Sequence, residues 1–199
     1  GFLVLGGRDA ITNEILIKKH LEPSDVVLHA DVVGAPFVVI KAEQKQPSQQ
    51  TIQEAADFAA AYSRAWREML SVVDVYWVRP EQLSKTAPSG QYLEKGAFMI
   101  QGARNYIRRV PLKIAIGVRR DNERMQVVAG PLKAVRERVI TYVELVPGDL
   151  TSAKLAQQIR RLFAGRAGDE ERNNILKIRL EDIQQLIPLG KGLIYQREK

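Results

Sequence analysis

The stretch GFLVLGGRDAITNEI, residues 1–15, places a glycine pair between an apolar run and a charged, helix-favouring run. This order predicts a strand over residues 2–5, a turn at Gly6 and Gly7, and a helix over residues 10–21. Glycines between a strand and a helix often cradle phosphate. Neither common nucleotide-binding fingerprint, G-x-G-x-x-G or G-x-x-x-x-G-K-[ST], is present. The turn is therefore a weak candidate for a free nucleotide site.

The residues around this turn carry both signs of charge. Asp9, Asn13 and Glu14 are suited to the start of a helix, where side-chain oxygens cap free N–H groups and negative charge meets the positive end of the dipole. Arg8 works against that dipole. We therefore expect another group, either a protein carboxylate or an external phosphate, to hold Arg8.

The rest of the first half reads as further strands and one secure helix. Branched and aromatic residues predict strands over 26–30, 37–41 and 72–78. Thr51 and Glu54 fit a capping box, and apolar residues at spacings of three and four predict that the helix they begin runs on through Trp66 and Met69. The polar segment 44–50 before it is expected to be a loop.

The second half predicts a compact α+β unit of its own. Strands are expected over 113–118, 125–129 and 139–146, helices over 131–138 and 151–163, a turn at 147–149, a polar and mobile segment at 164–174, and a mixed final element at 175–187. The predicted class is α/β of the α+β kind, with a mixed β-sheet packed by helices followed by a smaller α+β unit. The predicted domains are residues 1–110 and 111–199.

The 199-residue chain has a net charge of +7, and residues 103–139 alone carry that excess. Such a local field favours a polyanion such as nucleic acid or an anionic membrane, although a merely solvated surface is the alternative. No apolar run approaches the roughly 18 residues of a membrane span, and no signal peptide is recognised. The absence of cysteine excludes disulfides and thiolate metal sites and favours a reducing, cytoplasmic setting. The start at Gly1 without methionine is typical of a domain cut from a longer protein.

The sequence offers little for catalysis. His29 and Asp31 alternate on one strand and share a face, but the chain has only one other histidine, His20, so a zinc site would need carboxylates from elsewhere. A structural role for the pair is the better interpretation. No nucleophile elbow is present. We expect no enzyme activity, no cofactor and no metal site.

Several separated motifs occur in the order found in one known family. They are residues 6–10, 13–16, 25–31, 34–35 and 38–41, followed by residues 78–93 with their Ser-Lys-Thr-Ala-Pro-Ser-Gly core. Residues 1 to about 107 thus resemble the NFACT-R domain, the RNA-binding module of the ribosome-associated quality-control family that includes NEMF and RqcH. The second half is similar to the C-terminal extension of archaeal members.

The resemblance implies a factor that binds obstructed large ribosomal subunits, engages tRNA and supports C-terminal tailing of stalled chains. Its expected partners are tRNA and large-subunit RNA, with ribosomal proteins as a further possibility, while membrane is not expected and the oligomeric state is left open. Charge and motif position together nominate the RNA-binding residues Arg8, Asn13, His29, Lys41, Ser84, Lys85, Thr86, Arg104, Arg108 and Arg109. The residues nominated to shape the motifs are Gly6, Gly7, Asp9, Asp31, Gly34, Pro88 and Gly90.

Two other functions remain open on the sequence alone. One is a protein-interaction module that docks on ribosomal proteins through residues 140–199. The other is a metal-dependent hydrolase built on His29 and Asp31. Backbone phosphate contacts by arginine and lysine need no catalytic group, and this favours the noncatalytic RNA-binding function.

Overall fold

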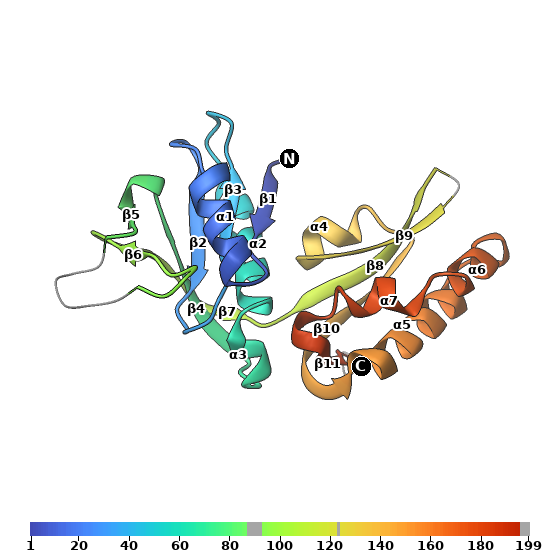
Figure 1. The fold of residues 1–199 in the computed structure, drawn as a ribbon. Coiled ribbons are helices and arrows are strands. Elements are labelled where there is room, and N and C mark those ends of the chain that lie inside the picture. Colours follow the sequence, from blue (N-terminus) through green and yellow to red (C-terminus); the bar gives the residue numbers. More distant parts are fainter. Residues whose placement is uncertain (87–92, 123, 196–199) are drawn as a thin grey trace. The chain divides into compact units, whose positions relative to one another are not determined.

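The computed structural model describes residues 1–86, 93–122 and 124–195 (Figure 1). Contacts divide the chain into two compact units. The first comprises residues 1–64 and 72–110, and the second comprises residues 65–71 and 111–199. The α+β class is confirmed. That the two units are independent domains stays a prediction, and the membership of residues 65–71 in the second unit was not predicted.

A five-stranded sheet forms the centre of the first unit. Its strand order is β1 (Leu3–Gly6), β3 (Phe37–Lys41), β2 (Val26–Ala30), β4 (Val72–Val78) and β7 (Asn105–Pro111). The pairs β1–β3, β2–β3 and β2–β4 are antiparallel, with His29 opposite both Phe37 and Tyr76. A short 3-10 turn η1 (Pro80–Gln82) leads into a separate two-stranded ladder of β5 (Leu83–Ser84) and β6 (Met99–Ile100).

Helices cover both faces of this sheet because both sets of alternating side chains are apolar. Helix α1 (Ala10–His20) packs Leu16 and Ile17 against Val27 and Tyr76. Helix α2 (Gln49–Ala61) covers the opposite face with a row of buried alanines. Because alanine side chains are small, α2 can approach the sheet closely.

The start and the end of α2 correct two predictions. The helix begins at Gln49, because the Ser48 hydroxyl accepts the N–H of Thr51 at 3.2 Å and caps it. The Glu54 carboxylate accepts a hydrogen bond from the Gln50 side chain, so the predicted Thr51 capping box was wrong.

The predicted continuation of α2 to Met69 was also wrong. The Ser63 hydroxyl donates back to the carbonyl of Ala60 at 2.8 Å and helps to close the last turn. Trp66 lies in the short helix α3 (Arg64–Arg67), and Met69 is exposed in a left-handed conformation. The three- and four-residue spacing simply continued across a real break in the helix.

The second unit is built on a four-stranded antiparallel sheet. Its order is β11 (Lys191–Ile194), β10 (Thr141–Thr151), β8 (Ile114–Asp121) and β9 (Arg124–Gly130). Its helices are α4 (Leu132–Arg136), α5 (Ser152–Arg166), α6 (Asp169–Leu176), α7 (Leu180–Gln184) and the 3-10 turn η2 (Pro188–Gly190). The core gathers around Leu145, Ile159 and Phe163, all fully buried.

Two predictions for this unit were wrong. The predicted turn at residues 147–149 is an irregularity inside β10, where the register with β11 shifts between Val146 and Leu150. Pro147 lies at this irregularity. Proline has no N–H to donate to the ladder, so it is tolerated where the ladder is interrupted. The predicted mobile segment 164–174 contains most of α6, whose acidic first turn suits the dipole and which buries Ile175.

None of the helices in the described part of the chain combines the length and the apolar character that crossing a membrane requires.

Candidate RNA-binding surface

One end of the five-stranded sheet brings together several of the nominated residues. Gly7 donates its N–H to the carbonyl of Phe37 at 2.9 Å, and the Asp31 N–H donates to the carbonyl of Asp74 at 2.8 Å. The Arg109 N–H donates to the Asp74 carboxylate at 2.7 Å. The loop end, defined as residues 6–9, 31–36, Asp74 and residues 108–109, therefore spans the sheet from β1 to β7. At about 4.8 Å per strand this is a width of roughly 19 Å.

The glycine turn at the loop end is shaped by close backbone packing. A Cβ on Gly7 would lie 1.9 Å from the Asn13 Oδ1 atom. That oxygen accepts the N–H of Phe37 at 3.2 Å and fastens the helix start to β3. Asn13 is thus engaged inside the protein, and the glycine allows α1 to begin directly against the sheet.

Asp9 caps α1 as expected. Its carboxylate accepts the N–H of Thr12 at 2.8 Å, while the Thr12 hydroxyl accepts the N–H groups of Arg8 and Asp9. The hydrogen bond from the Thr12 N–H is the main reason that the pKa of Asp9 lies below its ordinary value. The capping box leaves the Arg8 side chain exposed at the helix start. No hydrogen bond or ion pair of its guanidinium is found within the described residues.

Asp31 holds two side chains of the segment that enters β7. The Tyr106 hydroxyl donates to its carboxylate at 3.2 Å, and the Arg104 guanidinium lies 3.7 Å from it. The guanidinium of Arg104 also lies over the ring of Tyr76, 4.7 Å from its centroid. A hydrogen bond with Tyr106 raises the pKa of Arg104, so this side chain stays cationic.

Asp74 holds the next two residues in the same way. Its carboxylate accepts a hydrogen bond from the Arg108 guanidinium at 2.6 Å and the N–H of Arg109 at 2.7 Å. The Arg109 bond, followed by the Arg108 bond, lowers the pKa of Asp74. Arg109 has a φ of 54°, a left-handed conformation that is uncommon for a residue other than glycine. Its exposed guanidinium has no ion pair within the described residues.

We call the set Tyr76, Arg104, Tyr106 and Arg108, with Asp31 and Asp74, the arginine–tyrosine cluster. The rings of Tyr76 and Tyr106 meet edge to face with centroids 5.7 Å apart, and the Arg108 guanidinium lies 4.0 Å from the Tyr106 centroid. Tyr76, Tyr106 and Asp74 were not nominated from the sequence. Asp74 and Tyr76 are two residues apart on β4, as Tyr106 and Arg108 are on β7, and this spacing was the available signal. Nothing in the sequence placed those two strands side by side.

His29 is packed under the cluster as a neutral ring. Its Nε2 atom lies 3.2 Å from the carbonyl of Ala35 and its Nδ1 atom 3.3 Å from the Tyr76 hydroxyl. A carbonyl can only accept, so Nε2 carries the proton and Nδ1 accepts from Tyr76. Burial lowers the pKa of His29 below its ordinary value. These contacts favour a structural role over an RNA contact.

Lys41 and Lys85 are engaged by the protein. Lys41 donates to the fully buried Asp25 carboxylate at 2.5 Å and to the carbonyl of His20 at 2.6 Å. Lys85 donates to the carbonyl of Ala97 at 2.8 Å and contacts the Glu14 carboxylate at 3.3 Å. We therefore leave both ammonium groups out of the candidate surface.

The remaining nominated residues have different surroundings. The Ser84 hydroxyl accepts the N–H of Thr86 at 3.1 Å, and Thr86 is exposed. Gly34 has a φ of 79°, which a glycine accommodates in the tight connection from β2 to β3. Pro88 and Gly90 lie outside the described residues. In the described part of the chain, no three metal-binding side chains come together, so His29 and Asp31 lack a third ligand there.

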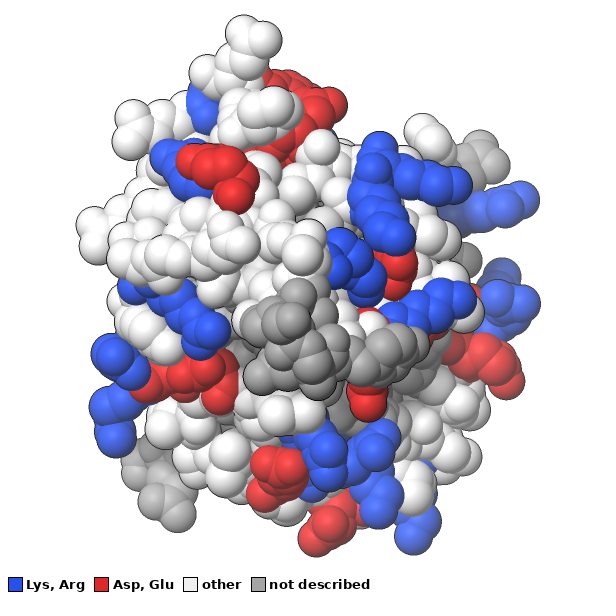
Figure 2. Space-filling view, turned by 60° about the vertical axis from the view of Figure 1, so that its left-hand side comes forward, with Lys and Arg blue, Asp and Glu red and all other residues white. Residues whose placement is uncertain are grey.

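The charges of this surface are partly balanced. On the face that Figure 2 draws, Lys and Arg groups lie beside Asp and Glu groups rather than in one continuous basic field. The pairs Arg104–Asp31 and Arg108–Asp74 agree with that picture. Both pairs are exposed to solvent and add little to stability, but each partly neutralises its arginine.

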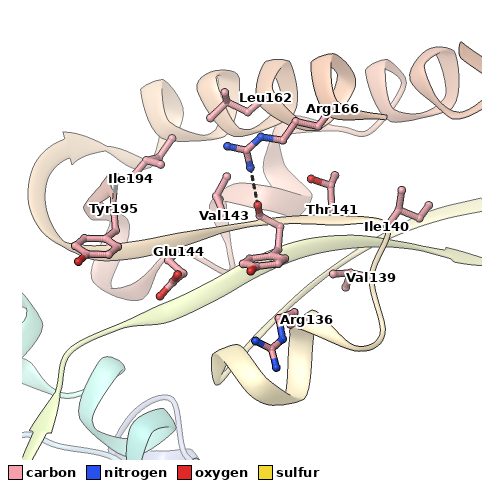
Figure 3. A pocket seen from close by; sticks show the side chains of 11 residues that line it. Arg136, Val139, Ile140, Thr141, Val143, Glu144, Leu162, Arg166, Ile194 and Tyr195 are labelled. Atoms are coloured by element: carbon pink, nitrogen blue, oxygen red, sulfur yellow. Dashed lines mark hydrogen bonds between the residues drawn. The ribbon is translucent and has the colours of Figure 1, made fainter. Parts of the chain in front are cut away.

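The second unit carries a pocket of about 660 Å³ beside β10 (Figure 3). Arg136 of α4 and Arg166 of α5 contribute its basic groups, and Arg166 donates to the carbonyl of Tyr142 at 2.8 Å. Ile140 and Tyr195 add exposed apolar surface. Basic groups beside apolar surface suit a polypeptide segment better than a small catalytic substrate.

An α+β fold that displays exposed arginines and layered tyrosines has the features of a nucleic-acid-binding module. The chain matches the family described as "NFACT protein RNA binding domain" over residues 1–102. The chain therefore belongs to this family of RNA-binding domains. Domains of this family occur in the RqcH and NEMF ribosome quality-control factors.

Two curated relatives are similar to this chain over different lengths. The Archaeal Rqc2 homolog aRqcH of Methanocaldococcus jannaschii is 42% identical over 190 residues, 96% of this chain and 27% of the relative. The Ribosome quality control complex subunit NEMF of Homo sapiens is 43% identical over 107 residues, 53% of this chain and 10% of the relative. The archaeal relative thus matches both units, although the chain spans about a quarter of its length.

A solved structure is also similar, the C-terminal part of the fibronectin/fibrinogen-binding protein from Streptococcus suis. It is 25% identical, with a TM-score of 0.47, and the match covers 55% of this chain and 41% of that one.

Proposed function

We propose that the chain is a noncatalytic module that binds tRNA or large-subunit ribosomal RNA. In this proposal it forms part of a cytoplasmic factor that engages obstructed large ribosomal subunits and supports C-terminal tailing of stalled chains. The similarity to ribosome quality-control proteins supports ribosome quality control as the setting. The RNA-binding family match supports the class of partner.

The observation that carries the proposal is the arginine set at the loop end. Arg8, Arg108 and Arg109 lie at the loop end, and the Arg104 guanidinium reaches Asp31 there at 3.7 Å. Lys41 and Lys85 are engaged elsewhere. The guanidinium groups of Arg8 and Arg109 have no ion pair within the described residues. Phosphate oxygens are the partners that such groups bind best.

The number of phosphate contacts fixes the expected salt dependence. If four arginines each neutralise one phosphate, log affinity falls with log salt at a slope of roughly −2.8 for single strands and −3.6 for duplex. We would measure binding of tRNA and of isolated large ribosomal subunits between 50 and 200 mM salt. Salt-independent binding, or no binding at low salt, would contradict the proposal.

A matched pair of charge reversals localises the surface. Arg109→Glu should weaken RNA binding, because it replaces a phosphate contact at the loop end with a repulsive charge. Arg161→Glu makes the same change on exposed α5 in the second unit and should leave RNA affinity within about twofold. Equal losses from both variants would show a diffuse electrostatic attraction and would contradict a localised surface.

The pocket beside β10 supports a second candidate function, docking of a ribosomal protein through the second unit. Arg136 and Arg166 outnumber Glu144, the one acidic residue among the described residues that line the pocket, and this favours an acidic, extended segment as the occupant. Arg136→Glu should then weaken binding to RNA-free ribosomal proteins while leaving binding to isolated tRNA intact. The hydrolase alternative has no comparable support, since His29 is engaged by Ala35 and Tyr76.

A further inference from the structure

We propose that the arginine–tyrosine cluster stacks an unpaired RNA base on the outer side of Arg108. This inference rests on the proposed RNA-binding function and deepens it, because it specifies RNA with at least one exposed base as the ligand of this subsite. Arg108 follows the family match, which ends at residue 102, so the match itself does not nominate this residue.

Tyr76, Tyr106 and Arg108 form three successive layers, with the two rings edge to face and the guanidinium over the Tyr106 ring. The Tyr76 ring meets the Tyr106 ring at 5.7 Å, and Arg108 covers Tyr106 at 4.0 Å. Tyr76 is only 4% exposed, whereas the Arg108 side chain is 63% exposed. The layers therefore run from the protein interior to solvent and end on a guanidinium, a group on which RNA bases stack.

Two carboxylates hold the layers in place before any ligand arrives. Asp74 accepts the Arg108 guanidinium at 2.6 Å, and Asp31 accepts the Tyr106 hydroxyl at 3.2 Å. These bonds restrict long side chains that would otherwise lose rotamer freedom on binding. The arrangement therefore reduces the ordering cost of forming a stack.

The same carboxylates weaken a purely phosphate-binding role for this part of the surface. Arg108 and Arg104 each face an aspartate, so their attraction for phosphate is partly neutralised. A planar contact with a base does not require the positive charge to be unpaired. Arg109, the next residue along the chain, has no such ion pair within the described residues and is the better phosphate contact.

An unpaired base fits this subsite better than a duplex. In a double helix both faces of each internal base are covered by its neighbours, and a side chain cannot stack on them. Loops, bulges and ends present free base faces. The subsite should therefore distinguish unpaired from paired RNA without reading sequence, since every base has a π-face.

The test compares conservative variants that keep the charge. Arg108→Lys removes the planar group, and Arg161→Lys, at an exposed position of α5 outside the candidate surface, is the matched control. Binding would be measured with a uridine oligomer and with an abasic ribose-phosphate oligomer of equal length. We expect Arg108→Lys to weaken binding of the uridine oligomer by at least about fivefold, near the lower limit for one stacked base. Its salt slope and its affinity for the abasic oligomer should stay unchanged, and Arg161→Lys should match the wild type on both oligomers.

A second pair of variants tests the layer beneath. Tyr106→Leu should produce the same selective loss, and Tyr106→Phe, which keeps the ring, should retain more than half of the wild-type affinity. Thermal melting of each variant controls for folding, and quenching of a 2-aminopurine base in the oligomer reports stacking directly. If Arg108→Lys binds both oligomers like the wild type while Arg108→Glu binds neither, Arg108 is a phosphate contact and the stacking inference is wrong. That outcome leaves the proposed function standing, whereas failure of the wild type to bind either oligomer or tRNA at low salt overturns the proposed function.

Discussion

The Glu14 carboxylate accepts a hydrogen bond from the backbone N–H of Gly96 at 2.8 Å, although 82 residues separate them in the chain. The same carboxylate is paired with Lys18 at 2.6 Å and Lys85 at 3.3 Å. It thereby fastens the segment before β6 onto α1. These contacts, first of all the bond with Lys18, lower the pKa of Glu14 from 4.5 to about 2.

Glu14 should make the stability of the first unit sensitive to acid. Its folded-state pKa is depressed, so its contribution is complete above about pH 4.5 and is lost as pH falls toward 2. Melting temperatures of wild type and Glu14→Gln would be compared from pH 7 to pH 2.5. We expect the difference between the two proteins to shrink steadily below pH 4.5. Parallel curves over the whole range would show that the Glu14 charge does not stabilise the fold.

Gly96 is required by the same junction. It has a φ of 79°, and a Cβ there would lie 2.5 Å from the carbonyl oxygen of Ala10 and 2.6 Å from its Cα. Backbone atoms cannot move aside as a flexible side chain can. Gly96→Ala should therefore destabilise the protein by about 1–3 kcal/mol.

Gly165→Ala is the matched control for that substitution. Gly165 lies in α5, and a Cβ there meets nothing within 4 Å. The change should stabilise the protein by about 0.5–1 kcal/mol, because alanine loses less backbone entropy in a helix. Chemical denaturation of both variants measures the two effects. Destabilisation by both, or by neither, would contradict the close approach at Gly96.

The local part of this structure was predictable from sequence because it depends on neighbouring residues. The glycine turn after β1, the cap at Asp9 and the branched and aromatic residues of β2 and β3 are short-range signals, and each led to the observed element. Helix ends were less predictable. Ser48 and Thr51 both suit an N-cap, and only the observed geometry shows that Ser48 fills that position.

The candidate site was only partly predictable because its geometry is long-range. Charge and motif position nominated both Lys41 and Arg108, yet Lys41 meets a buried carboxylate and Arg108 covers an aromatic ring. That difference depends on which strands become neighbours. Asp25 and Asp74 gave no sequence signal that would have separated the two cations.

The contact of Lys41 with Asp25 predicts a structural role that can be measured. Asp25 is fully buried, so Lys41→Met leaves a carboxylate without its cation and should cost about 3–5 kcal/mol of unfolding free energy. Lys45→Met, at an exposed position four residues later, should stay within about 0.5 kcal/mol of the wild type. Denaturant titration provides both values. If Lys41→Met keeps wild-type stability but loses RNA affinity, Lys41 is a phosphate contact after all.

Arg8 should behave in the opposite way. Its guanidinium has no ion pair within the described residues, while its backbone N–H remains in the capping box. Arg8→Ala should therefore leave the melting temperature unchanged and reduce the magnitude of the salt slope for tRNA binding by about 0.7–0.9. A fall in stability with unchanged RNA binding would assign Arg8 a structural role.

Trp66 provides a test of how the chain is divided between the two units. Although it follows α2 directly, it belongs to the second unit, where its indole N–H donates to the carbonyl of Lys191 at 2.7 Å and its side chain is 1% exposed. Trp66→Ala should destabilise the second unit by about 3–5 kcal/mol, because it leaves a large cavity. Trp66→Phe should cost less, since it keeps most of the volume and loses mainly the hydrogen bond.

Hydrogen exchange read residue by residue separates the two units in this experiment. In Trp66→Ala the amides of β8 and β10 should exchange faster, while those of β2 and β3 should keep their wild-type protection. The reason is that Trp66 fills the core beside β11 rather than the core between α2 and the five-stranded sheet. Faster exchange in β2 and β3 with unchanged β8 would place Trp66 in the core of the first unit. A fragment of residues 111–199 should likewise be less protected than the same residues in the full chain, because it lacks the indole that β11 packs against.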